Sequence, residues 1–141
     1  MVSPEPVYHL TPRSDFLGGI QGALYSPPRL QLDGFVHCAT RHVLLSVAGD
    51  YFAGLAEPLL VLEIEPARLG AELRYEAPAP IAGGGTEHLR NATLFPHVYG
   101  PIDLAAISGV GVLERDGEGY AWPATFTSPA DFLSRAHQSA G

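Results

Sequence analysis

The sequence predicts an α+β domain built mostly from short β-strands, with two or three helices. Three observations indicate this fold class: alternating apolar residues recur along the chain, helix-type periodicity is confined to a few segments, and Pro, Gly and polar residues separate the segments. The 141 residues, 46% hydrophobic and 16% charged, have the length and composition of one globular domain. We therefore expect residues 1–141 to form a single domain.

The first half of the chain is expected to hold two strands and two helices. Thr11 followed by Pro12 has the form of a helix cap and a first helical residue, although the glycine pair at 18–19 weakens this helix. Thr40 can cap a second helix, in which apolar residues recur on one face. The predicted elements are a strand at 7–10, a helix at 11–24, a strand at 35–39 and a helix at 41–54.

Strands dominate the second half. Residues 58–65 alternate, so that Leu60, Leu62 and Ile64 point to one side of a strand. The sequence SPAD at 128–131 has the form of a capping box and predicts a closing helix. The remaining predicted elements are strands at 72–76, 97–102, 105–114 and 120–122 and a helix at 129–138.

One long segment, residues 77–95, has no periodicity and many helix and strand breakers. A loop of this length is uncommon inside a compact domain and is often functional, so we interpret it either as a lid or as a mobile insertion. Its Gly83–Gly85 run is not a phosphate-binding loop, because no Gly-Lys-Ser/Thr follows. A hinge or spacer is the better interpretation of these glycines.

Charge and cysteine content narrow the function classes. The net charge of −7 and the absence of a basic cluster argue against general binding of nucleic acid. No apolar run is long enough to span a membrane, and no signal peptide is recognisable, so we expect a cytoplasmic protein. Cys38 is the only cysteine, which suits a reducing compartment, and we expect it to be a buried small hydrophobe rather than a nucleophile. The oligomeric state is not predicted.

His9, His37 and His97 each fall on a predicted strand beside aromatic or apolar residues. Each ring could be buried with its own protein partner, or the three could ligate a metal, or they could form a polar cradle for an organic ligand. We expect no metal, because the close spacing of zinc ligands and the HExxH pattern are both absent. In a cradle, neighbouring rings add flat faces for stacking. These rings belong to Tyr8, Phe35 and Tyr99.

The motifs that carry these histidines resemble a known family. They are VYHLTPRSDF at 7–16, GFVHCAT at 34–40 and FPHVYGP at 95–101, and the resemblance extends over residues 7 to about 110. They are similar to the bacterial domain of unknown function 952 family, itself distantly similar to ADP-ribosyltransferases and tRNA 2′-phosphotransferases. The resemblance implies a cleft between two small, mostly antiparallel sheets, in an enzyme of transferase type that binds NAD or a related nucleotide.

The resemblance also assigns site roles. It implies that His9 orients a ribose, that His37 packs on the nicotinamide, and that His97 takes a third position where related enzymes carry a glutamate. The missing carboxylate leaves protein ADP-ribosylation, phosphotransferase-type chemistry, another nucleotide ligand and lost catalysis as alternatives. The further residues assigned to ligand binding are Tyr8, Thr11, Phe35, Thr40, Arg41, Glu76 and Tyr99.

Two assignments and the function itself keep alternatives. Arg41 either meets a phosphate or is an ordinary surface arginine, and Glu76 is either a site acid or an exposed carboxylate at a strand end. Histidines in an apolar cleft could instead run acid–base chemistry on a small metabolite. A binding or regulatory domain without catalysis is the third hypothesis.

Overall fold

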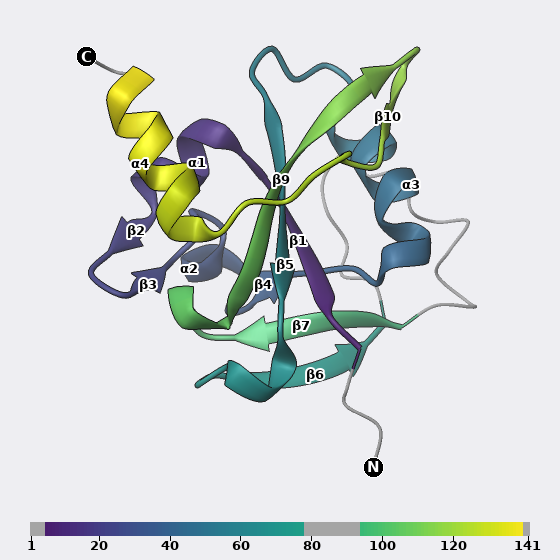
Figure 1. Ribbon diagram of the computed structural model, residues 1–141. Coiled ribbons are helices and arrows are strands. Elements are labelled where there is room, and N and C mark those ends of the chain that lie inside the picture. The colour runs from purple at the N-terminus through teal and green to yellow at the C-terminus, as the bar shows by residue number, and fades with distance from the viewer. Residues whose placement is uncertain (1–4, 78–93, 140–141) are drawn as a thin grey trace.

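The computed structural model describes residues 5–77 and 94–139, which form four α-helices and three antiparallel sheets (Figure 1). The sheets have the strand orders β1-β5-β9-β10, β2-β3-β8 and β4-β7-β6. The strands are β1 (Val7–Pro12), β2 (Ile20–Gln21), β3 (Leu24–Tyr25), β4 (Val36–His37), β5 (Leu59–Ile64), β6 (Glu72–Glu76), β7 (Phe95–Tyr99), β8 (Ile102–Asp103), β9 (Ile107–Asp116) and β10 (Gly119–Ala121). The helices are α1 (Arg13–Gly18), α2 (Leu30–Asp33), α3 (Arg41–Phe52) and α4 (Pro129–Ser139).

The predicted α+β class with antiparallel sheets is confirmed, but the number of elements differs from the expectation. Three sheets replace the expected two, because the hairpin β2–β3 pairs with β8 as a small sheet of its own within the described residues. The additional short elements include α2, which lies in the Pro-rich connection, and the strands β2 and β3, whereas α1 takes the place of the longer helix predicted at 11–24. Elements of two to four residues carry too little periodicity to be recognised in a sequence.

The central strand β5 pairs with β1 and β9, and side chains on both of its faces are buried. Figure 1 shows α3 on one side of this sheet and α1 and α4 on the other. Leu60, Leu62 and Ile64 enter one hydrophobic cluster, whereas Leu59 and Val61 enter a second one against α3. The predicted alternation along this strand is therefore confirmed. The register of β1 on β5 places His9 opposite Leu62, which puts the histidine on the face of the first cluster.

The predicted helix at 11–24 is wrong in both its start and its end. Thr11 and Pro12 belong to β1, and α1 ends at Gly18 before the chain turns into the hairpin β2–β3. Thr11 does not cap the helix. Instead, Glu57 accepts hydrogen bonds from the backbone nitrogen of Ser14 at 2.7 Å and from its hydroxyl at 2.8 Å. This carboxylate comes from the distant segment before β5, so the local sequence does not show it.

Gly19 occupies a position with no room for a side chain. A Cβ atom there would lie 2.6 Å from the backbone oxygen of Ser26 and 2.9 Å from the ring of Tyr25. We expect Gly19→Ala to lower the free energy of unfolding by about 2 kcal/mol, because the hairpin backbone would have to shift. Urea denaturation measures this, with Gly18→Ala as the matched control, since nothing lies within 4 Å of a Cβ at that position. Equal losses in the two variants would contradict the steric explanation.

The predicted strand at 35–39 is shorter than expected and joins two sheets. Val36 and His37 pair with β7, and Ala39 forms an isolated bridge with Tyr8 through backbone hydrogen bonds of 2.9 and 2.7 Å. The following helix, α3, is confirmed, and Thr40 takes its N-cap position without a capping hydrogen bond from its side chain. This segment therefore lies between β1 on one side and β7 on the other.

The closing helix is also confirmed, with the hydroxyl of Ser128 accepting a hydrogen bond of 3.1 Å from the backbone nitrogen of Asp131.

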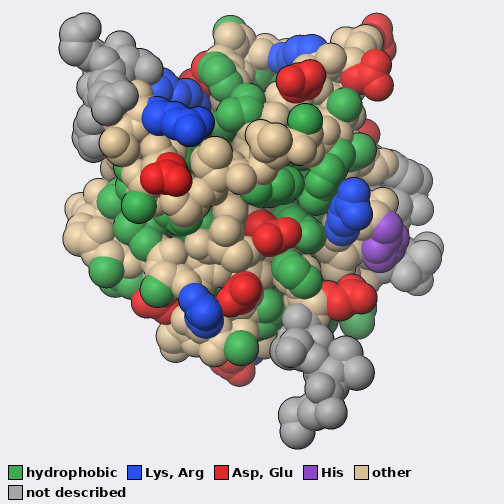
Figure 2. All heavy atoms as spheres, in the orientation of Figure 1, with side chains coloured by type: hydrophobic (Ala, Val, Ile, Leu, Met, Phe, Trp, Pro, Cys, Tyr) green, Lys and Arg blue, Asp and Glu red, His purple; other side chains and the backbone are tan. Residues whose placement is uncertain are grey.

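Residues 78–93, which include the Gly83–Gly85 run and nearly all of the predicted lid or insertion, lie outside the described residues. No helix within the described ranges is long and apolar enough to cross a membrane. Figure 2 shows that on the face carrying α4 and β9 the basic side chains are dispersed among acidic ones.

Candidate functional site

A cavity of about 350 Å³ opens between β1, the segment 35–39 and the helix α3. Its wall is mostly apolar, and Pro27, Pro28 and Leu30 close the side next to α2. All three histidines singled out in the sequence line this one cavity. A volume of this size lies at the lower end of the range for small-molecule sites.

Strand pairing brings two of the histidines together. His37 on β4 and His97 on β7 are directly opposite in the antiparallel register, and their ring centroids lie 5.7 Å apart in an edge-to-face arrangement. Phe35 packs against both, with centroid distances of 4.6 Å to His37 and 4.1 Å to His97. The two motifs FVHC and FPHVYG thus form one aromatic and imidazole cluster at the cavity wall.

His9 is held by the protein through both ring nitrogens. Its Nδ1 donates to the backbone carbonyl of His37 at 2.7 Å, and its Nε2 lies 3.2 Å from the hydroxyl of Tyr25, which in turn lies 3.0 Å from Oγ1 of Thr11. Burial lowers the pKa of His9 from its ordinary value to about 4, so the ring is neutral at pH 7. A neutral ring that donates from Nδ1 carries its lone pair at Nε2, next to the tyrosine hydroxyl, whose single proton goes to Oγ1 of Thr11. His9 therefore lines the cavity with its ring, and both of its nitrogens face partners inside the protein.

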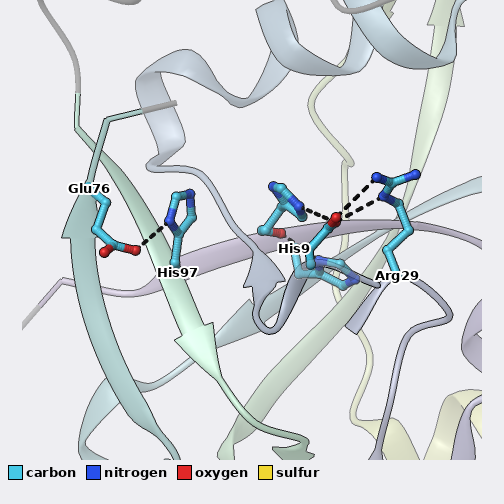
Figure 3. Close-up of polar contacts among 6 residues, drawn as sticks. His9, Arg29, Glu76 and His97 are labelled. Atoms are coloured by element: carbon cyan, nitrogen blue, oxygen red, sulfur yellow. Dashed lines mark hydrogen bonds and ion pairs between the residues drawn. The ribbon is translucent and has the colours of Figure 1, made fainter. Parts of the chain in front are cut away.

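His37 is oriented by a carboxylate. Its Nε2 lies 2.7 Å from Oδ2 of Asp33 and donates to it, because a carboxylate can only accept. Arg29 holds the same carboxylate through both oxygens, at 3.0 and 3.1 Å (Figure 3). Burial lowers the pKa of His37, partly offset by the hydrogen bond to Asp33, while that of Asp33 is lowered first by its hydrogen bond from Arg29. At pH 7 the arrangement is an ionised aspartate paired with a neutral imidazole.

His97 is oriented in the same way by a second carboxylate. Figure 3 shows Glu76 on β6 pointing to His97 on the neighbouring strand β7, where Nδ1 donates to Oε1 at 2.8 Å. The hydroxyl of Tyr99 donates to the same oxygen at 2.5 Å, and these two hydrogen bonds, the tyrosine first, lower the pKa of Glu76. The His97 side chain is only 3% exposed and stacks on Phe35.

Each of the paired histidines keeps one ring nitrogen open. Among the described residues, neither Nδ1 of His37 nor Nε2 of His97 has a hydrogen-bond partner. In the same part of the chain, no buried side-chain nitrogen or oxygen lacks a partner. The two open nitrogens are therefore accessible, and in a neutral ring each is a lone-pair acceptor. The site presents two acid-backed imidazole bases side by side at an apolar cavity.

Several predicted ligand-binding residues lie elsewhere. Thr40 and Arg41 do not line the cavity, and the Arg41 guanidinium packs over the ring of Trp122 at 4.5 Å, which corresponds to the alternative of an ordinary surface arginine. Glu76 and Tyr99 do not line it either but support His97 from behind. The remaining predicted residues do line it: Tyr8, Thr11 and Phe35.

Cys38 and the metal question add two observations. Cys38 is buried in the first hydrophobic cluster, as predicted, and burial raises the pKa of its thiol, so it stays protonated at neutral pH. Within the residues that the structure describes, no group of three or more His, Cys, Asp or Glu side chains could hold a metal ion. The two open imidazole nitrogens fall short of the three protein ligands usual for catalytic zinc.

Sequence reasoning missed three residues that shape the site: Arg29, Asp33 and Tyr25. Asp33 precedes His37 by four residues across Gly34, and this acid-x-x-x-His spacing is a weak local signal that could have been noticed. Tyr25 meets His9 only through the fold, so no local pattern indicates it. Asp15 also lines the cavity, and burial raises the pKa of its carboxyl group.

Comparisons with known proteins show which solved structures the fold is similar to and which family model the sequence matches. The crystal structures of protein CC0527 from Caulobacter crescentus and of its double mutant are each 22% identical to the chain with a TM-score of 0.65, covering 92% of this chain and 98% of theirs. The solution NMR structure of CC0527 is 24% identical with a TM-score of 0.60, covering 82% and 90%. At this identity the likeness shows the fold alone. No curated protein matches the sequence. A family model described as "Protein of unknown function (DUF952)" matches residues 11–110, and the chain therefore belongs to this family.

Proposed function

We propose that the chain is an enzyme of ADP-ribosyltransferase-like fold that binds NAD or a related nucleotide, with the base-and-ribose end in the histidine-lined cavity. The observation that carries this proposal is the pair of open imidazole nitrogens of His37 and His97 at one apolar cavity. Both nitrogens accept hydrogen bonds, so the ligand must offer donors. Ribose hydroxyls and a carboxamide NH₂ are donors of this kind.

The size and polarity of the cavity support binding of the nucleoside end of the ligand there, and not of the whole dinucleotide. A mostly apolar space of about 350 Å³ suits one ring with its sugar, and Phe35 offers a flat face beside the two imidazoles. Phosphate groups would stay at the rim, where Arg29 lines the cavity with a side chain that is 55% exposed. Arg29 therefore replaces Arg41 as the arginine proposed to meet a phosphate.

The position of Glu76 favours one kind of transfer chemistry. Its carboxylate is turned to His97 and Tyr99 instead of lining the cavity, so no carboxylate at that position faces the ligand to stabilise a cationic sugar. Neutral imidazoles can instead take a proton from a hydroxyl group. This supports a phosphotransferase-type reaction, in which a ribose hydroxyl is the reacting group, over ADP-ribosylation of a protein.

Calorimetric titration with NAD and ADP-ribose tests the proposal. We expect His37→Ala to weaken nucleotide binding at least about tenfold, because one acceptor for the ligand is lost. His42→Ala is the matched control, since His42 is exposed at the start of α3 and does not line the cavity. The unfolding free energy of both variants should stay within about 1 kcal/mol of the wild type. Absence of heat and of a thermal shift at millimolar NAD and ADP-ribose would overturn the proposal.

A second candidate is acid–base catalysis on a small hydroxyl-bearing metabolite. It is favoured by the Asp33–His37 pair, because a carboxylate that orients a neutral histidine is a common arrangement for a general base. The two candidates differ in the ligand that raises the melting temperature. A nucleotide-free metabolite that stabilises the wild type, with NAD and ADP-ribose inert, would favour this second candidate. A ligand that binds through His37 without any turnover would point to a binding domain.

A further inference from the structure

A turn around Gly34 brings Asp33 and His37 together. Gly34 ends α2 with a φ of +82°, a left-handed conformation that residues with a side chain rarely adopt, and the chain then runs into β4. As a result, two residues four positions apart outside any common helix meet at 2.7 Å. The contact is therefore created by the backbone of this segment and not by helical spacing.

The contact fixes which nitrogen of His37 carries the proton. The Asp33 carboxylate accepts from Nε2–H, which leaves Nδ1 as the lone-pair nitrogen on a ring that lines the cavity. Arg29 binds both oxygens of the carboxylate and keeps it ionised. The His37 side chain is 25% exposed whereas that of His97 is 3% exposed, so His37 is the more accessible of the two open imidazoles.

We propose that Asp33 is the positioning residue of the site, which holds His37 as the Nε2–H tautomer so that Nδ1 serves as the base toward a ligand hydroxyl. In this step the O–H bond of the ligand breaks, an Nδ1–H bond forms, and the electron pair stays on oxygen. The Asp33 carboxylate offsets the positive charge of the resulting imidazolium. The inference rests on the proposed function only in placing a hydroxyl-bearing ligand in this cavity.

Within the described parts of the chain, four titratable or charged groups act on His37. They are Asp33 and Arg29 from the α2 segment, His97 from β7 and His9 from β1. Asp33 favours the protonated ring, whereas Arg29 and His97 disfavour it. Removing Asp33 and removing Arg29 must therefore move the titration of His37 in opposite directions, which a general disturbance of the structure would not do.

Carbethoxylation by diethyl pyrocarbonate tests this without any ligand, because the reagent modifies accessible unprotonated imidazole nitrogens. Trypsin places His37 in the peptide 30–41 and His42 in the peptide 42–68, so mass spectrometry follows the two rings separately. We expect Asp33→Asn to slow modification of peptide 30–41 several-fold at pH 7, because an amide can donate to Nε2 as readily as accept from it. The exposed His42 should react at an unchanged rate.

The pH profile of the same rate gives the apparent pKa of His37. We expect this pKa to fall in Asp33→Asn and to rise in Arg29→Met. Arg29→Met lacks the trypsin site at residue 29, so in this variant His37 is followed in the peptide 14–41, where it is the only histidine. Asp50→Asn, an exposed acidic residue on α3, is the matched control and should leave the profile unchanged. A folded Asp33→Asn protein is recognised by protection of buried His9 in the peptide 1–13.

If Asp33→Asn does not fold, the test rests on Arg29→Met alone. An apparent pKa of His37 that does not rise in Arg29→Met would overturn the inference. An unchanged rate and profile in folded Asp33→Asn would overturn it as well. NAD is then added as a separate arm. Protection of peptide 30–41 by NAD supports the proposed function, and lack of protection counts against that function while leaving the role of Asp33 as measured.

Discussion

Replacing His9 by alanine is expected to lower the free energy of unfolding by about 3 to 4 kcal/mol. The ring is buried, and its two nitrogens lie within hydrogen-bonding distance of the His37 carbonyl and the Tyr25 hydroxyl. Truncation leaves a buried carbonyl without its donor and removes the packing of the ring on Tyr25, whose centroid lies 5.7 Å away. Urea denaturation at pH 7, followed by far-ultraviolet circular dichroism, measures the loss.

Tyr25→Phe is the matched comparison for this result. It removes only the hydroxyl shared between His9 and Thr11, so a smaller loss of about 1 to 2 kcal/mol is expected. A His9→Ala variant as stable as the wild type would show that His9 is free for a ligand instead of serving as a structural support. Such a result would again support the predicted contact between His9 and a ribose.

Acidification from pH 7 to pH 4.5 is expected to remove about 2 kcal/mol of stability through His9 alone. The pKa of His9 is lowered from 6.5 to about 4 in the folded protein. Below pH 6.5 the unfolded chain therefore binds a proton that the folded chain does not, and unfolding becomes easier as the pH falls. Burial lowers the pKa of His37 as well, so this ring adds to the loss in the same direction.

The pH window separates His9 from the carboxylates whose pKa values are lowered. Asp15, whose pKa is raised by burial, changes stability in the opposite direction to His9 and does so equally in the wild type and in the variants compared below. The pKa values of Asp33, Glu57, Glu72 and Glu76 are lowered from 3.8 or 4.5, so any stabilisation that they contribute is fully present above pH 4.5. Urea titrations at successive pH values measure the slope in this window. His9→Asn, which keeps a donor for the His37 carbonyl but does not titrate, should flatten the slope, whereas His42→Asn should retain it. Parallel slopes for His9→Asn and the wild type would contradict the assignment.

Local sequence patterns predicted an element correctly where its structure depends mainly on residues within the same segment. The alternation in β5 and the Ser128–Asp131 cap are read within a few residues, and both are observed. The helix expected at 11–24 failed because Thr11 pairs with Leu60 of β5, and a distant strand outweighs a local capping preference. The hairpin that follows α1 is likewise fixed by the close approach of Gly19 to Ser26 and not by its own pattern.

The candidate site shows the same division. The sequence indicated His37 and His97 because each lies in a short motif with aromatic neighbours, and strand register brings them opposite each other. It could not indicate that His9 would spend both nitrogens on the His37 carbonyl and on Tyr25, because these partners are long-range contacts. Motifs therefore predict which residues gather, whereas the free atoms that remain for a ligand depend on tertiary hydrogen bonds.

The pairing order β1-β5-β9 has a consequence for how the chain folds. The central strand β5 binds β1 from the beginning of the chain and β9 from near its end, so the main sheet consists of contacts between distant segments. Closing such long loops costs entropy before the contacts can repay it, which makes folding slow. On the ribosome, His9 and His37 are synthesised before His97 on β7, so the cavity that all three line cannot be complete until β7 has emerged.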